Sequence, residues 1–474
     1  MPQMTWQELL CAKRSRRHVS AAQSDVRTEF RKDYHRIIGS ASFRRLQDKT
    51  QVYPLNRGDF VRTRLTHSLE ASSFAGSLGD IVFRRLEEQG AQGVDGQTRE
   101  NCCDILKCAG LVHDIGNPPF GHFGEFAIRQ WFSENLPELC FKGVPVTQLL
   151  TPQEQGDLLH FEGNAQALRV LTRLHCLVDL EHGMNLTYAL LNTIVKYPVS
   201  SLGINKKSGN IKDKKMGYFT SEQALYEDIA ASTGAVGCRY PLTFLLESAD
   251  DIAYKTADIE DAVVKGLISF SALLEELNRL PERCETPAEL ELTQQAAKKL
   301  SDCLAAAKER GLPDPEETAV QNLMISLQSK LIMAAADAFI DNYAAIMAGE
   351  FPQELLAASP ARVLSEALSD IAYRYAFRSA GILRTELAAD AMMTFLLGRI
   401  TGAALRFDTE RQRITDKNLI SVMSGNYTEI CRNNSRGADD AGQCRCRLQL
   451  VTDYVCGMTD GFAQELFRSL SAIT

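Results

Sequence analysis

The chain has 474 residues, 45% of them hydrophobic, and a formal net charge of −8. This length is enough for one large domain or two fused helical domains, and the negative net charge excludes an overall electrostatic attraction to nucleic acid or anionic membranes. We find no run of about 18 apolar residues that could span a bilayer and no apolar signal segment at Met1. We therefore expect a cytoplasmic protein that does not bind membranes.

Basic residues are concentrated between Lys13 and Arg64. Two interpretations of this stretch are open. It forms either a solvated basic face or a patch that faces phosphate groups.

The thirteen cysteines are scattered, and neither Cys102-Cys103 nor Cys444-x-Cys446 has the C-x-x-C spacing of a zinc or redox site. We expect free, mostly buried thiols in a reducing compartment. All eight histidines precede residue 183, so imidazole chemistry is confined to the N-terminal half.

Helical periodicity dominates, and alternating strand-like runs are scarce, which predicts an all-α fold. Gly116, Pro118 and Pro119 interrupt the pattern, and a helix is expected to begin behind them and run through Trp131. Residues 200–217 are polar and rich in lysine, which predicts a surface loop or an insertion. The other predicted helices lie at residues 68–88, 104–115, 161–180, 185–196, 241–265, 266–279, 288–310, 316–348, 353–375, 380–404 and 448–471.

Four acidic and histidine side chains form a candidate metal site. His113 and Asp114 are adjacent at a predicted helix end and can place an imidazole and a carboxylate on one ion. His67 from an earlier helix and Asp250 from a later one would complete two nitrogen and two oxygen ligands. Mixed ligands of this kind suit Mn²⁺, Fe²⁺, Mg²⁺ or Zn²⁺ and leave positions open for water and a phosphate oxygen.

Each piece of this site has a plainer interpretation when taken alone. A His-Asp pair is more often a capped helix end than a ligand pair, and His67 alone is more often a hydrogen-bonded core residue. Asp250 and Asp251 could belong to a solvated helix face. The occurrence of all the pieces in order favours the metal site.

Seven segments together resemble the HD-domain deoxynucleoside triphosphate triphosphohydrolases, and among these the bacterial dGTPase branch. The resemblance is dense over residues 35–265 and reaches the C-terminus through the last segment. HDIGNPPFGHFGE with ESADDIAY is highly specific, whereas a His-Asp pair is not. The segments are FRRLQDKTQVYPL (43–55), RTRLTHSLE (62–70), LVHDIGNPPFGHFGE (111–125), HFEGNAQALR (160–169), TIVKYP (193–198), LLESADDIAYKTADIEDAV (245–263) and DYVCGMTDGFA (453–463).

The resemblance implies a basic N-terminal segment at 1–34, a helical HD-domain catalytic core at 35–265, and additional C-terminal helices at 266–474. This C-terminal region would pack on the core and complete the nucleotide site and an oligomer interface. The implied metal ligands are His67, His113, Asp114 and Asp250, holding one divalent ion per chain. We expect Mn, Mg or Fe, with Zn or Ni as metals that the purified protein could carry.

His122 and Glu125 lie three residues apart and therefore on one face of the helix expected after Pro119. This pairing suits general acid–base work, with Glu125 orienting His122, although a solvent-exposed pair has the same spacing. The resemblance implies a catalytic role for both residues and contact of His160 with phosphate. A dinuclear site that uses His122 and His160 as extra ligands is an alternative, against which the resemblance argues.

Phosphate ligands are expected to be cationic and convergent. Arg64 lies one turn before His67, and its family counterpart contacts phosphate. The segment of Lys196 and Tyr197 also matches the family, with Lys196 on the phosphates. Without the resemblance, Arg64 and Lys196 could equally be surface charges.

Asp250, Tyr254 and Asp258 are four residues apart and align along one helix face. The resemblance implies that the Tyr254 ring packs at C2′ of the sugar, and that Asp258 and Gln51 hydrogen-bond the 3′-hydroxyl. Ordinary core packing is the alternative for Tyr254.

The base pocket has the weakest signal. We expect Arg447, or its neighbour Arg445, to approach a nucleotide in the same or a neighbouring subunit, although no spacing argument establishes it.

The implied reaction converts a dNTP and water into a deoxynucleoside and tripolyphosphate by attack at the α-phosphorus, with dGTP favoured. The resemblance also implies a homo-oligomer, expected to be a hexamer, and leaves single-stranded DNA or a nucleotide as candidate effectors. Two alternatives remain at this stage. One is an HD-type nucleotidase or phosphodiesterase, and the other is a nucleic-acid-binding regulator that uses the basic N-terminal stretch.

Overall fold

A computed structural model describes residues 3–16, 25–51, 62–176 and 179–471. Over these ranges the chain is dominated by helices, and the strands β1 (Cys140–Phe141) and β2 (Val144–Pro145) form one small antiparallel hairpin. The prediction of an all-α fold is confirmed.

The helices of the first part of the chain carry the four metal-ligand candidates or lie next to them in the sequence. They are α1 (Trp6–Leu9), α2 (Glu29–Ile38), α3 (Ala41–Arg45), α4 (Arg64–Glu88), α5 (Gly96–Val112), α6 (Gly121–Asn135), α7 (Val146–Leu149), α8 (Pro152–Leu159), α9 (Gly163–Thr172), α10 (Tyr188–Ile194), α11 (Gln223–Ser232) and α12 (Pro241–Val264).

The remaining helices extend this core on two sides. They are α13 (Phe270–Arg279), α14 (Pro287–Glu309), α15 (Pro315–Asp341), α16 (Tyr343–Met347), α17 (Arg362–Ile371), the π-helix η7 (Ala372–Phe377), α18 (Ala380–Arg406), α19 (Ile414–Ser421), α20 (Gly425–Ser435), α21 (Asp440–Cys456) and α22 (Asp460–Ser471).

Several predicted boundaries are wrong for local reasons. The helix predicted at 161–180 ends at Thr172, because the chain turns back on it: Met184 N–H donates to Leu171 O at 2.8 Å, and Gly183 has a φ of +52°. The helix predicted at 353–375 begins only at Arg362, after Pro360. A proline disfavours helical backbone in the residue before it.

Other differences concern breaks and short helices. The prediction at 448–471 spans two helices, α21 and α22, and the prediction at 316–348 spans α15 and α16. Periodicity does not predict helices α1, α2, α3, α7, α8, α11, α19 and α20. The segment 200–217 contains only 3₁₀ turns, Ser201–Gly203 and Ile211–Asp213, so its prediction as a loop is confirmed.

Helices α4 and α5 pack closely, and this contact brings the first metal-ligand candidates together. A Cβ atom added to Gly110 of α5 would lie 2.5 Å from Ser72 Cα of α4, so only glycine fits there. The Ser72 hydroxyl donates to Lys107 O at 2.8 Å across the same contact. The close approach sets the N-terminal part of α4 beside the C-terminal end of α5.

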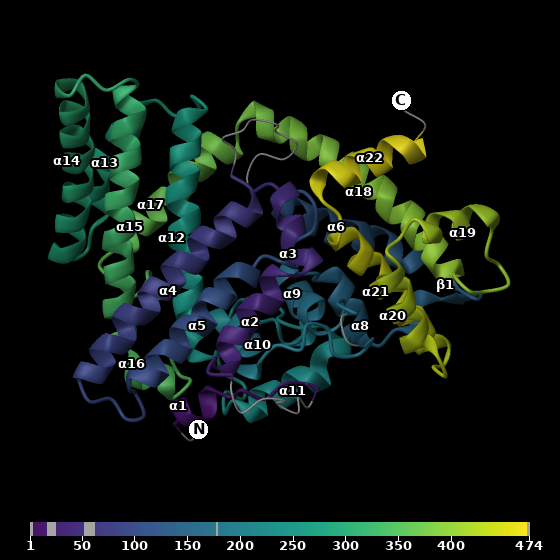
Figure 1. Ribbon diagram of the computed structural model, residues 1–474. Coiled ribbons are helices and arrows are strands. Elements are labelled where there is room, and N and C mark those ends of the chain that lie inside the picture. Colours follow the sequence, from purple (N-terminus) through teal and green to yellow (C-terminus); the bar gives the residue numbers. More distant parts are fainter. Residues whose placement is uncertain (1–2, 17–24, 52–61, 177–178, 472–474) are drawn as a thin grey trace.

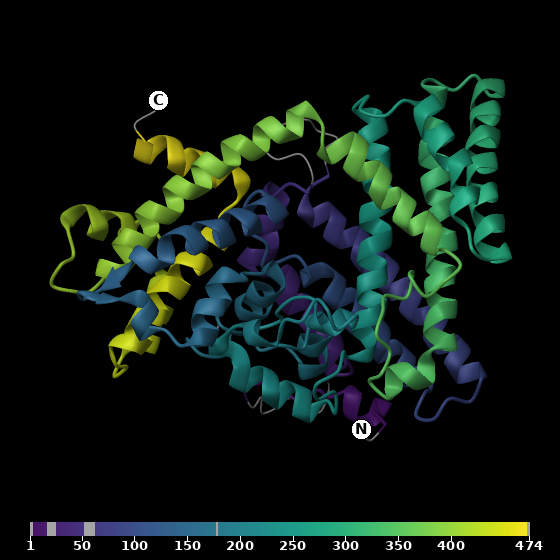
Figure 2. The same cartoon turned by 180° about the vertical axis from the view of Figure 1, so that it is seen from behind.

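The C-terminal helices cover the core from two sides. Helices α13, α14 and α15 stand together on one side, and α18 crosses from this side to α19 at the opposite side (Figure 1, Figure 2). Helix α15 packs on α4, α12 and α14, and α18 packs on α6 and α21. By length and composition α15 could cross a membrane, but half of its most apolar stretch is buried inside the molecule.

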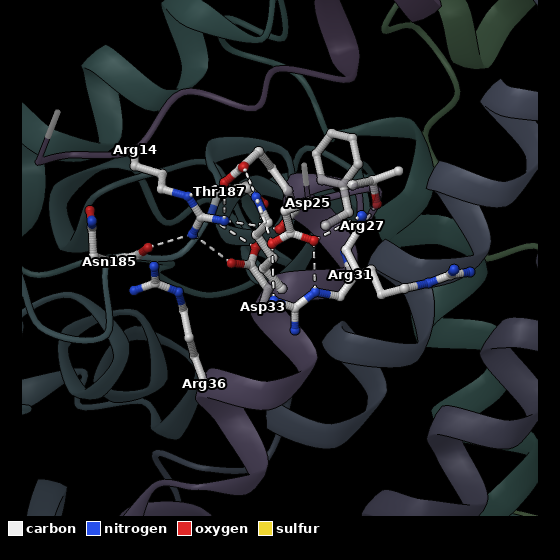
Figure 3. A network of polar contacts seen from close by, with 12 residues as sticks. Arg14, Asp25, Arg27, Arg31, Asp33, Arg36, Asn185 and Thr187 are labelled. Carbon is white, nitrogen blue, oxygen red and sulfur yellow. Dashed lines mark hydrogen bonds and ion pairs between the residues drawn. The ribbon is translucent and has the colours of Figure 1, made fainter. Parts of the chain in front are cut away.

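The basic N-terminal stretch contributes to the interior rather than forming only a solvated face. Arg14 is buried and donates to the Asp33 carboxylate at 2.6 Å and to Asn185 O (Figure 3). The same carboxylate accepts from the Thr187 amide and hydroxyl at 3.0 and 2.6 Å. Since Thr187 is the N-cap of α10, this network anchors α10, which leads to Lys196.

All thirteen cysteines are free, and eight of them are buried, as expected for structural thiols. Burial raises the pKa of several of these thiols, that of Cys431 and Cys444 to about 12. High thiol pKa values make these cysteines poor nucleophiles.

Candidate active site

The ends of three helices carry the predicted metal ligands. Helix α4 begins with a capping box in which the Thr63 hydroxyl accepts from Thr66 N–H, and it places His67 near its first turn. Helix α5 ends at Val112, so that His113 and Asp114 lie at its C-terminal end. Helix α12 begins with Pro241, a residue well suited to the first turn, and carries Asp250 in its middle.

The four predicted ligands converge. His67 Nε2 and His113 Nε2 each lie 3.1 Å from Asp250 Oδ1, and His113 Nε2 lies 3.6 Å from Asp114 Oδ1. The donor atoms of His67, His113 and Asp114 lie within 4.8 Å of one another. Two ligands at right angles, each about 2.1 Å from one ion, lie about 3 Å apart. The spacing therefore fits a divalent cation.

Hydrogen bonds around the ligands orient them. His113 Nδ1 lies 2.8 Å from Gly110 O, so Nδ1 carries the proton and Nε2 presents its lone pair to the site. His113 Nε2 is buried and has no hydrogen-bond partner among the described residues, as expected of a ligand atom. Asn117 donates to Asp114 Oδ1 at 2.8 Å and fixes that carboxylate.

Each acidic ligand is also paired with a basic side chain. Arg64 Nη1 donates to Asp114 Oδ2, and Lys196 Nζ donates to Asp250 Oδ2 at 2.7 Å. Burial raises the pKa of both carboxyl groups, but these cations more than offset it and hold both pKa values well below the usual range. The carboxylates are therefore ionised at neutral pH, and two cations flank the site.

His122 and Glu125, which are predicted to act as an acid–base pair, lie within hydrogen-bond distance of each other. His122 Nδ1 lies 3.0 Å from Glu125 Oε2, and the other oxygen of this carboxylate accepts from Gly163 N–H at 2.6 Å. The hydrogen bond that His122 donates to the Glu125 carboxylate raises the pKa of His122. Glu125 is buried, whereas 75% of the His122 side chain is exposed. His122 can therefore reach a ligand while Glu125 holds its orientation.

The predicted residue His160 is less constrained. It is the C-cap of α8, its side chain is exposed, and it makes no side-chain hydrogen bond to the described residues. Its contact with phosphate stays a prediction.

Three residues predicted to read the sugar have buried polar atoms suited to that role. The Tyr254 ring stacks on Phe377 of η7 at 6.2 Å between centroids, and burial raises the pKa of its hydroxyl. Asp258 Oδ2 and Gln51 Oε1 are buried acceptors that have no hydrogen-bond partner within the part of the chain that the structure describes. Buried acceptors are rarely left unpaired, so both could receive a hydroxyl group from a ligand.

Tyr197 is buried beside Lys196, and no hydrogen bond of its hydroxyl to a described residue is present. The structure does not bring Arg447 together with the metal ligands. Its guanidinium is buried, donates to Phe407 O at 2.8 Å and to Gln443 O at 3.0 Å, and lies over the Phe141 ring. Arg445 instead pairs with Glu154 at 2.8 Å.

Some residues of the site were missed by the sequence reasoning. Asn117 orients Asp114, and Gly116 packs against α9 so closely that a Cβ atom would lie 2.1 Å from Ala167 N. Both lie within HDIGNPPFGHFGE, so their position in that segment was the available signal.

Comparison with known proteins agrees with this geometry. The HD domain family matches residues 64–142. A deoxyguanosinetriphosphate triphosphohydrolase-like protein of Listeria monocytogenes is 42% identical over 478 residues, which span 99% of this chain and 100% of that protein. The chain belongs to the deoxyguanosinetriphosphate triphosphohydrolase family. It is therefore an HD-domain hydrolase.

Other members of the triphosphohydrolase family match over nearly the whole chain. A deoxyguanosinetriphosphate triphosphohydrolase-like protein of Synechocystis is 33% identical over 99% of this chain and 100% of its own length. The deoxyguanosinetriphosphate triphosphohydrolase of Serratia proteamaculans is 32% identical over 94% of each chain. The HD domain match contains His67, His113 and Asp114, whereas Asp250 lies beyond it.

Proposed function

We propose that this protein hydrolyses deoxynucleoside triphosphates, with dGTP favoured, to a deoxynucleoside and tripolyphosphate by water attack at the α-phosphorus. The observation that carries the proposal is the convergence of four metal-ligand candidates on one point flanked by Arg64 and Lys196. The names of the full-length relatives support the substrate class.

His67, His113, Asp114 and Asp250 would hold one divalent ion, for which we propose Mn, Mg or Fe, with Zn or Ni in purified protein. When bound, the ion would polarise the α-phosphate and lower the pKa of the attacking water. The ionised state of both carboxylates prepares the site for a cation.

Arg64 and Lys196 would bind phosphate oxygens. Among the described residues, the buried donor Arg64 Nε has no hydrogen-bond partner, so it would be available to a phosphate while Nη1 holds Asp114. Lys196 keeps its charge, because the Asp250 carboxylate more than offsets the effect of burial and raises the pKa of Lys196. Charge-assisted hydrogen bonds of this kind are stronger than neutral ones.

His122 would donate a proton to the leaving 5′-oxygen. This alkoxide is strongly basic, so its departure requires a proton donor. Glu125 occupies His122 Nδ1, which leaves Nε2 as the nitrogen that transfers the proton. The raised pKa of His122 keeps the imidazole protonated at higher pH.

Tyr254, Asp258 and Gln51 would select the sugar. The Tyr254 ring, braced by Phe377, would close the space at C2′. The unpaired acceptors of Asp258 and Gln51 would receive the 3′-hydroxyl. A buried site that pairs a substrate hydroxyl discriminates better than apolar shape alone.

We retain three further proposals on family grounds: location in the cytoplasm, assembly into a homo-oligomer, namely a hexamer, and an effector that is a nucleotide or single-stranded DNA. We also propose, on the same family grounds, that Arg447 contacts a nucleotide. The buried role of Arg14 gives no support to a primary nucleic-acid-binding function.

A substrate survey tests the proposed function. Hydrolysis of the four dNTPs and the four NTPs is measured with Mn²⁺ and with Mg²⁺. We expect dNTPs to be used in preference to NTPs and dGTP to be used best. Equal use of dGTP and GTP, or activity confined to nucleoside monophosphates or cyclic nucleotides, would contradict the proposal.

A further inference from the structure

Asp460, the first residue of α22, joins three distant parts of the chain. Its Oδ1 accepts from Phe120 N–H at 2.9 Å, and its Oδ2 accepts from the Thr50 amide and hydroxyl at 3.0 and 2.6 Å. The side chain is buried. Hydrogen bonds to a carboxylate are shorter and stronger than neutral ones. Asp460 is therefore firmly bonded to Thr50 and Phe120, which precede it in the chain by 410 and 340 residues.

The Phe120 contact bears on the acid–base pair. Phe120 has a φ of +64°, in the left-handed region that a bulky residue rarely adopts, and it is the N-cap of α6. Such a conformation persists only where the surroundings stabilise it. Since His122 is the second residue of α6, the conformation of Phe120 sets where His122 stands.

The Thr50 contact links Asp460 to the part of the site that carries Arg64 and His67. Thr50 pairs with Thr63 in an isolated antiparallel bridge, and Arg64 N–H donates to Lys49 O at 2.9 Å. Thr63 caps α4. The segment 49–51 is therefore attached to the start of α4, which carries Arg64 and His67.

A second contact supports this junction. Lys49 is buried and donates to Asn117 O and to Cys456 O, both at 2.6 Å. Burial lowers the pKa of Lys49 to about 8. Lys49 thus ties the loop that holds Asp114 to the end of α21, next to Asp460.

We propose that Asp460 is a positioning residue for catalysis, which holds His122 at the start of α6 in register with Arg64 and the metal ligand His67 at the start of α4. The inference rests on the proposed function, because it assigns the effect of Asp460 to proton transfer by His122. In this proposal Asp460 acts through His122 and does not itself contact the substrate.

A double-mutant cycle tests this role. Asp460→Asn keeps the size of the side chain but places an NH₂ group against groups that are themselves donors. We expect kcat for dGTP to fall on the order of 10²-fold, the cost of a misplacement of about 1 Å, with metal content unchanged. In a His122→Ala background the same substitution should change kcat by no more than about 2-fold.

A control substitution at another buried or exposed helix cap is needed to show that the effect belongs to Asp460, and Asp439 supplies it. Asp439→Asn alters the exposed N-cap of α21, whose carboxylate accepts from Gly442 N–H at 2.8 Å, and should leave kcat unchanged. A full multiplicative loss in the His122→Ala background, or an unchanged kcat in Asp460→Asn, would overturn the inference. If Asp460→Asn does not fold, Thr50→Val removes one hydroxyl donor and should show a smaller loss with the same dependence on His122.

A readout without substrate separates this inference from the proposed function. Modification by diethyl pyrocarbonate, mapped by mass spectrometry, reports each histidine, and the reagent attacks the neutral imidazole. Asp460→Asn should loosen the His122–Glu125 pair and speed modification of His122 several-fold, with the exposed His35 unchanged. An unchanged His122 rate would contradict the inference, whereas failure of the wild type to hydrolyse dGTP would contradict only the proposed function.

Discussion

His122 and Glu125 form a hydrogen-bonded pair of 3.0 Å in which one partner is exposed and the other is buried. The buried carboxylate is itself fixed by Gly163 N–H at the start of α9. The exposed imidazole therefore has a set orientation without being enclosed. The pair combines access to a substrate with a raised pKa of the proton donor.

Replacing Glu125 by Gln should shift the pH dependence of hydrolysis. The carboxylate raises the pKa of His122, so the protonated donor persists to higher pH, and activity is lost as pH rises through that pKa. Glu125→Gln removes this effect and should move the alkaline limb of kcat/KM to lower pH. A kcat/KM profile reports the free enzyme. Glu134→Gln, on the exposed side of the same helix, is the matched control and should leave the limb in place.

Asp250→Ala should remove the metal and the activity. Asp250 Oδ1 is the atom that both imidazoles approach, so its loss removes the centre of the ligand set. Metal content after chelation, repurification and reloading is the measurement, with circular dichroism to confirm that the helices remain. Asp251→Ala, whose carboxylate pairs with Lys255, should retain metal. Full activity in the Asp250 variant would rule out the ligand assignment.

His122→Ala should keep its metal and lose turnover. His122 contacts Glu125 rather than the ligand cluster, so its removal takes away proton transfer and leaves metal binding intact. The expected loss in kcat is on the order of 10²–10⁴-fold. Loss of stoichiometric metal in this variant would instead support a dinuclear site.

Tyr254→Ala should relax sugar selection. The ring stands one helical turn from Asp250 and is braced by Phe377, so a 2′-hydroxyl would have to displace it or be buried unpaired. An unpaired buried hydroxyl costs roughly 1–3 kcal/mol, and the ratio of kcat/KM for GTP to that for dGTP should rise about 10-fold. Asp258→Ala should weaken both substrates together, since both carry the 3′-hydroxyl. An unchanged ratio in Tyr254→Ala would make this residue core packing.

The sequence was sufficient to predict the parts of the site that depend on local signals. His113 and Asp114 are adjacent, His122 and Glu125 share a helix face by spacing, and a glycine and two prolines mark the intervening break. These relationships do not depend on how the helices pack against one another. The all-α fold was predictable for the same reason, because periodicity is a local property.

Contacts between distant segments could not be read in this way. The bonds from Asp460 to Thr50 and Phe120 depend on how α22 returns to the core, which no local pattern records. The stacking of Phe377 on Tyr254 could not be predicted either, because it depends on the position of the π-helix η7, which carries Phe377. Arg447 donates to Phe407 O, a contact between distant segments of the same kind, and its approach to a nucleotide stays a prediction.

We propose that water attacks the α-phosphorus of dGTP, and hydrolysis in ¹⁸O-labelled water locates the bond that breaks. We expect unlabelled deoxyguanosine and tripolyphosphate that carries one ¹⁸O on a terminal phosphate, because the bond between the α-phosphorus and the 5′-oxygen breaks. Formation of dGMP with pyrophosphate, of dGDP with phosphate, or of ¹⁸O-labelled deoxyguanosine would contradict it.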